Sequence, residues 1–190
     1  DTNGAIDVTD YNRNLIWRIP FSASAVSIYS GFVNNGGSGW LRTYVPVGVG
    51  TGMYADTNGD LFVSEFDKHR VVRFLRFPNQ ASVYAGTGIA GFVSDTLAAT
   101  LSTLNAPRNV VGDSAGNIYI ADFNNNRVRR VLRATGIMST VAGQGPCSET
   151  VWNYQGAATG ACIPTPSALV IDSSGFMYIA DGQYVRRIMS

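Results

Sequence analysis

The sequence predicts an all-β protein made of repeated antiparallel sheets. Three observations predict this class: one turn-and-strand phrase occurs four times, the residues after each turn alternate between apolar and polar, and no segment has helical periodicity. The four copies begin near Asp1, Asp56, Asp113 and Asp172. The third copy, DSAGNIYIADFNNNRVRRV, shows the alternation at Ile118 and Ile120, which is the pattern of a half-buried strand.

Each copy opens with an Asp-x-x-Gly turn. The turn glycines are Gly4, Gly59, Gly116 and Gly175. Glycine adopts positive φ without a steric penalty, so we expect left-handed backbone at these four positions.

The strands follow the turns in a regular order. Copy one supplies the alternating stretch after its turn, then NLIWRIPF and AVSIYSG. Copy two supplies TGMYAD before its turn, the alternating stretch, RVVRFLRF and ASVYAGTG, and copy three supplies RNVVGD, the alternating stretch, RVRRVLRA and IMSTVAGQG. Copy four supplies SALVID, its alternating stretch and YVRRIMS. Four short antiparallel strands in a repeat of about 57 residues predict the blades of a β-propeller.

The two ends of the chain fall inside blades. With the strands lettered a to d from the axis to the rim, copy one contains b, c and d, copies two and three are complete, and copy four ends after c. An unpaired strand edge invites aggregation. We therefore expect residues 1–190 to form a single propeller domain that is an excerpt of a longer chain, or a protomer whose open edges are completed by neighbours.

Two stretches carry a resemblance to a known family. LNAPRNVVGDSAGNIYIADFNNNRVRRV resembles an NHL repeat, and YAGTGIAGFVSDTLAATLSTLNAP resembles the long loop that joins successive NHL blades. The resemblance covers nearly all of the chain, with a divergent loop in copy one and a shortened turn in copy four. It implies a β-propeller, commonly of six blades, and implies little about activity because this fold hosts many functions.

The composition favours an extracellular protein. Only 14% of the residues are charged and the net charge is +1, so no long-range field draws this chain to nucleic acid or to an anionic membrane. Cys147 and Cys162 lie in one irregular stretch, which favours a local disulfide over two separate thiols. Such a disulfide stabilises the fold by about 3 kcal/mol in the chain-entropy model and implies an oxidising compartment.

An acid and an arginine recur in every copy. The predicted pairs are Asp10 with Arg18, Glu65 with Arg73, Asp122 with Arg130, and Asp181 with Arg187. One interpretation is a ring of anion-binding arginines, and the other is a structural bracket that locks strand b to strand c. Repetition in all four copies favours the bracket, because a buried guanidinium satisfies several acceptors at once.

Nucleic-acid binding and catalysis have weaker support. The arginines that enrich the c strands and their surroundings are Arg70, Arg76, Arg127, Arg129, Arg133 and Arg186, with Phe66, Phe74 and Phe123 nearby. Such a strip is compatible with single-stranded RNA, but the net charge and the absence of lysine clusters argue against it. His69 is the only histidine, so a three-histidine zinc site cannot form, and we interpret it as a turn or packing residue.

The sequence thus predicts a non-enzymatic extracellular scaffold or interaction propeller, a structural module of a cell-surface or fibrous assembly. Its expected partners are other protein chains, copies of itself, or glycans. Trp40 and Trp152 lie in the long loops and are candidate partner contacts, although such residues also pack down on a propeller face. We expect no cofactor, no bound metal, no nucleic acid and no membrane insertion. The alternatives are a hydrolase or lyase whose metal site lies outside this segment, and an RNA-binding propeller.

Overall fold

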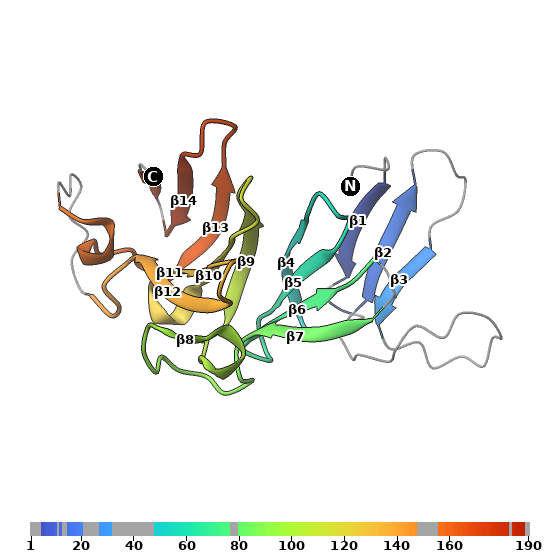
Figure 1. The fold of residues 1–190 in the computed structure, drawn as a ribbon, viewed down its shortest axis with the longest axis horizontal. Helices are drawn as coiled ribbons and strands as arrows, with labels where there is room; N and C mark the ends of the chain where they lie inside the picture. Colours follow the sequence, from blue (N-terminus) through green and yellow to red (C-terminus); the bar gives the residue numbers. More distant parts are fainter. Residues whose placement is uncertain are drawn as a thin grey trace.

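The computed structural model describes residues 5–10, 12, 15–20, 27–31, 48–76, 80–147, 156–182 and 184–188. Within these ranges the chain forms short antiparallel strands and three single-turn 3-10 helices (Figure 1). The first seven strands are β1 (Ala5–Asp10), β2 (Leu15–Pro20), β3 (Ser27–Gly31), β4 (Gly50–Ala55), β5 (Leu61–Glu65), β6 (Arg70–Phe74) and β7 (Ala81–Ala85). The others are β8 (Leu97–Ala98), β9 (Pro107–Gly112), β10 (Ile118–Asp122), β11 (Arg127–Val131), β12 (Ile137–Ala142), β13 (Pro166–Ile171), β14 (Met177–Asp181) and β15 (Tyr184–Ile188). The 3-10 helices are η1 (Ala99–Leu101), η2 (Phe123–Asn125) and η3 (Ala158–Gly160).

These strands form four sheets, one for each copy of the repeat. The sheet orders are β1-β2-β3, β4-β5-β6-β7, β8-β12-β11-β10-β9 and β13-β14-β15. We call these sheets blades one to four. Blade one contains strands b to d, and blade two contains strands a to d. Blade three contains strands a to d and one additional strand, and blade four contains strands a to c. The all-β prediction and the predicted distribution of strands are confirmed.

The Asp-x-x-Gly turns adopt the expected backbone. Gly59, Gly116 and Gly175 have φ of +82°, +81° and +85°. In the second blade, Oδ1 of Asp56 accepts hydrogen bonds from the backbone N–H groups of Asn58 and Asp60, which fixes the turn before strand b begins. Gly4 lies outside the described residues.

The hydrophobic cores lie between the blades. We call the side of a blade that meets the next blade in chain order its forward face, and the opposite side its backward face. Val71 on the forward face of blade two clusters with Val110 and Ile120 of blade three. Val128 on the forward face of blade three clusters with Leu169 and Ile179 of blade four. Each blade is thus held by burial against its neighbours.

Blade three has a fifth strand that the sequence did not predict. β8, from the loop after blade two, pairs with the outer edge of β12. The side chain of Asp95 supports this pairing, because its Oδ1 accepts hydrogen bonds from the N–H and the hydroxyl of Thr140 and from Nη2 of Arg129. The addition covers the rim edge of the blade, which would otherwise expose unpaired backbone groups.

The predicted disulfide is confirmed. Cys147 and Cys162 are bonded with a Cα–Cα distance of 5.8 Å. The bond ties the segment that follows β12 to the approach of β13, so it fastens blade three to blade four. No helix in the parts of the chain that the structure describes could span a membrane.

Candidate functional site

In blades two, three and four the acid at the end of strand b is a buried acceptor, but its predicted arginine partner is wrong. Glu65 pairs with Arg70, while Arg73 pairs with Asp60. The register of the β5–β6 hairpin explains the difference, because Glu65 lies opposite Arg70 and Arg73 lies opposite Phe62. A separation of eight residues across this short turn places the two members of the predicted pair at different ends of the hairpin.

The predicted acid–arginine pairs are also wrong in blades three and four. Nη1 of Arg129 lies 3.6 Å from Oδ2 of Asp122, and Nε of Arg186 lies 2.7 Å from Oδ2 of Asp181. The predicted partners lie elsewhere: Arg130 stands opposite Tyr119 in the β10–β11 register, and Arg187 lies over the ring of Phe176. In blade one, Nε1 of Trp17 donates to Asp10, and the side chain of Arg18 lies outside the described residues.

These acids tie strand b to the segment that leads into strand a. Glu65 accepts a hydrogen bond from the N–H of Gly48 at 2.7 Å, and Asp122 accepts one from the N–H of Asn105 at 2.7 Å. The equivalent position in blade four is Pro164, which has no N–H, and Oδ1 of Asp181 is buried without a hydrogen-bond partner among the described residues.

Burial controls the titration of both aspartates. Desolvation raises the pKa of Asp122 to about 6, against the opposing effects of hydrogen bonds from Asn105 and Asn125 and of the charge of Arg129. Desolvation likewise raises the pKa of Asp181, although its bond from Arg186 acts in the opposite direction.

A second repeated contact joins successive blades. Nδ1 of His69 accepts a hydrogen bond from the N–H of Ala106 at 3.0 Å, and Oδ1 of Asn126 accepts one from the N–H of Thr165 at 2.9 Å. All four residues have positive φ. We call this contact the inter-blade latch. His69 therefore occupies the turn position expected from the sequence, and its imidazole supplies the acceptor that an asparagine supplies one blade later.

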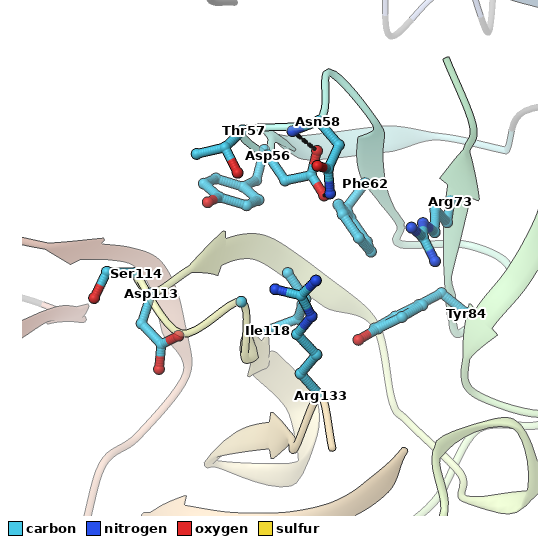
Figure 2. Close-up of a pocket in the computed structure, with 12 residues that line it drawn as sticks. Asp56, Thr57, Asn58, Phe62, Arg73, Tyr84, Asp113, Ser114, Ile118 and Arg133 are labelled. Atoms are coloured by element: carbon cyan, nitrogen blue, oxygen red, sulfur yellow. Dashed lines mark hydrogen bonds between the residues drawn. The ribbon is translucent and has the colours of Figure 1, made fainter. Parts of the chain in front are cut away.

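A cleft opens between blades two and three on the side of the Asp-x-x-Gly turns (Figure 2). Its volume is about 110 Å³. It is lined by Tyr54, Asp56, Thr57, Asn58, Phe62, Arg73 and Tyr84 of blade two and by Asp113, Ser114, Gly116, Ile118 and Arg133 of blade three. Two arginines from different blades thus face one small cavity.

The two tyrosines of the cleft, Tyr84 and Tyr54, lie near side chains of opposite charge. Burial raises the pKa of Tyr84, while the charges of Arg73 and Arg133 act to lower it. Burial also raises the pKa of Tyr54, and there the charges of Asp56 and Asp113 add to the effect. The cleft therefore has a basic end around Tyr84 and an acidic end around Tyr54.

A wider hollow of about 400 Å³ lies where strands a of successive blades approach the axis. It is lined by Thr51, Phe66, Arg108 and Ser167. The guanidinium of Arg108 lies 3.7 Å from the ring centroid of Phe123 and 5.4 Å from that of Phe66. This stacking presents a planar cation with an aromatic backing toward the axis.

Most of the arginines proposed for RNA binding are used inside the chain. Arg129 is fully buried, Arg70 and Arg186 pair with acids, and Arg127 donates to the backbone carbonyl groups of Asn125 and Gln144. Within the described ranges, no group of three or more His, Cys, Asp and Glu side chains is placed to hold a metal ion. Trp40 and Trp152 lie outside the described residues.

No family model matches the chain. Teneurin-3 from Danio rerio is 24% identical over 168 residues, which are 81% of this chain and 5% of that protein. Teneurin-3 from Mus musculus is 30% identical over 83 residues, which are 38% of this chain and 3% of that protein. The chain therefore spans a small fraction of the curated relatives that it matches.

Solved structures establish the fold class. A protein of unknown function from Bacteroides thetaiotaomicron superposes with a TM-score of 0.75 at 21% identity, over 98% of this chain and 44% of that one. Virginiamycin B lyase from Staphylococcus aureus gives 0.61 at 14% identity, over 99% of this chain and 50% of the lyase. A structure of the nidogen/laminin complex gives 0.64 at 16% identity, over 98% of this chain and 56% of that one. The fold is a β-propeller, and this chain spans about half of each matched chain.

Proposed function

We propose that this chain is a non-enzymatic interaction module of an extracellular propeller, and that its partners are other protein chains. The observation that carries the proposal is the forward face of blade four. Val128 of blade three is fully buried, whereas Val185, at the equivalent position of blade four, is 75% exposed. Burying one such side chain contributes about 1.5–3 kcal/mol, so this face has a substantial driving force for docking.

The chemistry of this face indicates what covers it. Blade three presents Val111, Tyr119, Ala121 and Val128 on its forward face. Blade four repeats the same four residue types at Val170, Tyr178, Ala180 and Val185. Blade three is covered by Leu169, Met177 and Ile179 on the backward face of blade four. The occupant that fits blade four is therefore the backward face of another blade of this type.

This contact is head-to-tail. Val8 on strand b of the first blade is 41% exposed on the backward face, where a further blade of the same polypeptide or of a second copy can dock. Such a heterologous interface closes into a ring or continues as a filament, depending on the rotation between copies. An extracellular setting is supported by the disulfide and by the low content of charged residues. The likeness to propellers in the nidogen/laminin complex and in an auxiliary nutrient binding protein from Bacteroides ovatus is consistent with an interaction role.

The test measures the mass of residues 1–190 in solution as a function of concentration, by sedimentation or light scattering. We expect the unmodified chain to associate and Val185→Asp to be monomeric, because an aspartate carboxylate cannot be buried unpaired in an apolar interface. Ile89→Asp is the matched control, since Ile89 is 69% exposed in the loop after blade two and should leave association unchanged. A monomeric unmodified chain, or equal association of the Val185 variant, contradicts the proposal.

A lyase-type enzyme is the second candidate, and the likeness in fold to virginiamycin B lyase favours it. Metal analysis of the full-length protein discriminates between the two, because this candidate places its metal site outside residues 1–190. Zinc or calcium bound in a fixed ratio to protein supports the enzyme, and its absence after supplementation supports the interaction module.

A further inference from the structure

We propose that the cleft between blades two and three binds a small oxyanion, a carboxylate, sulfate or phosphate group, held by Arg133 with the hydroxyl of Tyr84 (Figure 2). This site lies on a different surface from the forward face of blade four, so it goes beyond the proposed interaction role and does not depend on it. Four features of the cleft carry the inference.

The first feature is a guanidinium without a partner. Arg133 is exposed at the cleft, and among the described residues its side chain forms no hydrogen bond or ion pair. By contrast, Arg70, Arg129 and Arg186 are each paired with an acid. A guanidinium carries five N–H donors in a planar fork that matches the two oxygens of a carboxylate or phosphate. Arg133 thus presents a complete, unused fork to the cavity.

The second feature is that the backbone holds Arg133 in place. Its N–H donates to Oδ1 of Asn117 at 3.0 Å, and its side chain lies across Gly116. A Cβ at Gly116 would lie 2.7 Å from Cδ of Arg133, so only glycine leaves room for this course of the side chain. The backbone of Arg133 is therefore fixed beside the cleft, and Gly116 leaves room for the side chain.

The third feature is the opposite wall. Nε of Arg73 donates to Oδ2 of Asp60 at 3.1 Å, so this arginine is already neutralised and fixed. Tyr84 extends into the cleft with its hydroxyl toward Arg133 (Figure 2). The hydroxyl is a further donor for an oxyanion. Phe62 and Ile118 are buried beside these groups, and an apolar wall strengthens a charge-assisted hydrogen bond.

The acids at the far end of the cleft are engaged in their own turns. Asp113 accepts hydrogen bonds from the N–H and Nδ2 of Asn117 and from the hydroxyl of Tyr119. Burial alone would raise the pKa of Asp113, but these bonds and one from Ala115 together lower it, so the carboxylate stays ionised. Asp56 is used in the same way by its own turn. These two charges border the basic end without filling it, and they disfavour large polyanions.

The fourth feature is size and the contrast with the neighbouring cleft. A volume of about 110 Å³ is sufficient for one small oxyanion. Arg76 lies over Gly59 as Arg133 lies over Gly116. Asp7 of blade one occupies the strand position that Phe62 occupies in blade two. The forward face of blade one therefore carries a carboxylate at this position. Blade two has Phe62 at that position, so among the described residues no carboxylate stands at the equivalent place opposite Arg133.

The test is a titration of the chain with sodium sulfate, sodium phosphate and sodium acetate against sodium chloride at matched ionic strength, followed by the amide NMR shifts of Gly116 and Arg133. We expect a saturable shift with at least one oxyanion and none with chloride. Binding of acetate alone identifies a carboxylate site, and binding of sulfate or phosphate alone identifies a tetrahedral-anion site. Either pattern supports the proposal.

Two variants and one control locate the binding. Arg133→Gln removes the charge from an exposed residue and should weaken binding about tenfold or more, the effect of losing charge-assisted hydrogen bonds. Tyr84→Phe should weaken it by less. Arg187→Gln is the matched control, because Arg187 is exposed over Phe176 and lies outside the cleft. Equal binding by the chain with and without the Arg133 substitution, or no saturable shift with any of the three oxyanions, overturns the proposal. Because association through Val185 is measured without added oxyanion, the two proposals fail independently.

Discussion

Removing the acceptor of the inter-blade latch at His69 should lower the free energy of unfolding, because the N–H of the buried residue Ala106 would lose its hydrogen-bond partner. Ala106 is 1% exposed, and its N–H has the imidazole of His69 as its acceptor at 3.0 Å. Leaving a buried backbone N–H unsatisfied costs about 1–3 kcal/mol, so His69→Ala should lower the free energy of unfolding by this amount. For a chain of this size that corresponds to a fall in Tm of about 3–10 °C.

Two companion substitutions separate the hydrogen bond from the backbone strain. His69 has φ of +51°, a region that asparagine and glycine tolerate better than alanine. His69→Asn keeps an acceptor at the position that Asn126 occupies one blade later, so it should change stability by less than about 0.5 kcal/mol. His69→Gly removes the acceptor without strain, so its loss of stability combines the lost hydrogen bond with the greater freedom of glycine in the unfolded chain.

The assay is urea unfolding followed by tryptophan fluorescence and circular dichroism, with the slope of the transition compared among variants. If His69→Gly is as stable as the unmodified chain, the latch contributes nothing and the reasoning is refuted. The same holds if His69→Asn and His69→Ala are destabilised equally, because the acceptor would then be irrelevant. Asn126→Ala and Asn126→His repeat the experiment at Thr165 and should give the same ranking.

Two further predictions concern pH and redox state. Since the pKa of Asp122 is raised by burial to about 6, the folded chain holds this proton more tightly than the unfolded chain, and the free energy of unfolding should rise by up to about 3 kcal/mol as the pH falls from 7 to 4. Asp122→Asn should flatten this part of the profile, and an identical pH dependence in the variant would show that another group is responsible. Reduction of the bond between Cys147 and Cys162 should lower the stability by about 3 kcal/mol, while the double variant Cys147→Ser, Cys162→Ser should be insensitive to reductant. Unfolding with and without dithiothreitol measures this, and equal stability in both conditions contradicts it.

The repeat made the blades predictable because each one is specified locally. An Asp-x-x-Gly turn and period-2 alternation fix a hairpin wherever they occur, so four copies of the phrase yield four sheets. The wrong acid–arginine pairs came from counting residues rather than register. The partner of Glu65 is set by the length of the turn to Arg70, and only the paired strands reveal which side chains lie opposite each other.

β8 and the cleft were not predictable for a related reason. β8 comes from a loop without alternation, and its pairing partner β12 lies far along the chain. The signal that could have found it is Asp95, a lone acid in that loop with a buried arginine to match at Arg129. The cleft needs two blades in contact before Arg73 and Arg133 face one cavity, so its residues carry no spacing that a single repeat displays.

The repeats also act as internal controls for function, because equivalent residues differ in what surrounds them. Val128 and Val185 are the same residue at the same repeat position, yet the first is fully buried and the second is 75% exposed. Residue type alone therefore does not distinguish the two valines, and their difference in burial is the basis for the role that we propose for Val185. Arg76 and Arg133 likewise lie over equivalent glycines, but the face opposite Arg76 includes an acid at the position where the face opposite Arg133 has Phe62. In a repeat protein the departures from equivalence, rather than the repeated residues, identify the surfaces that are left for other molecules.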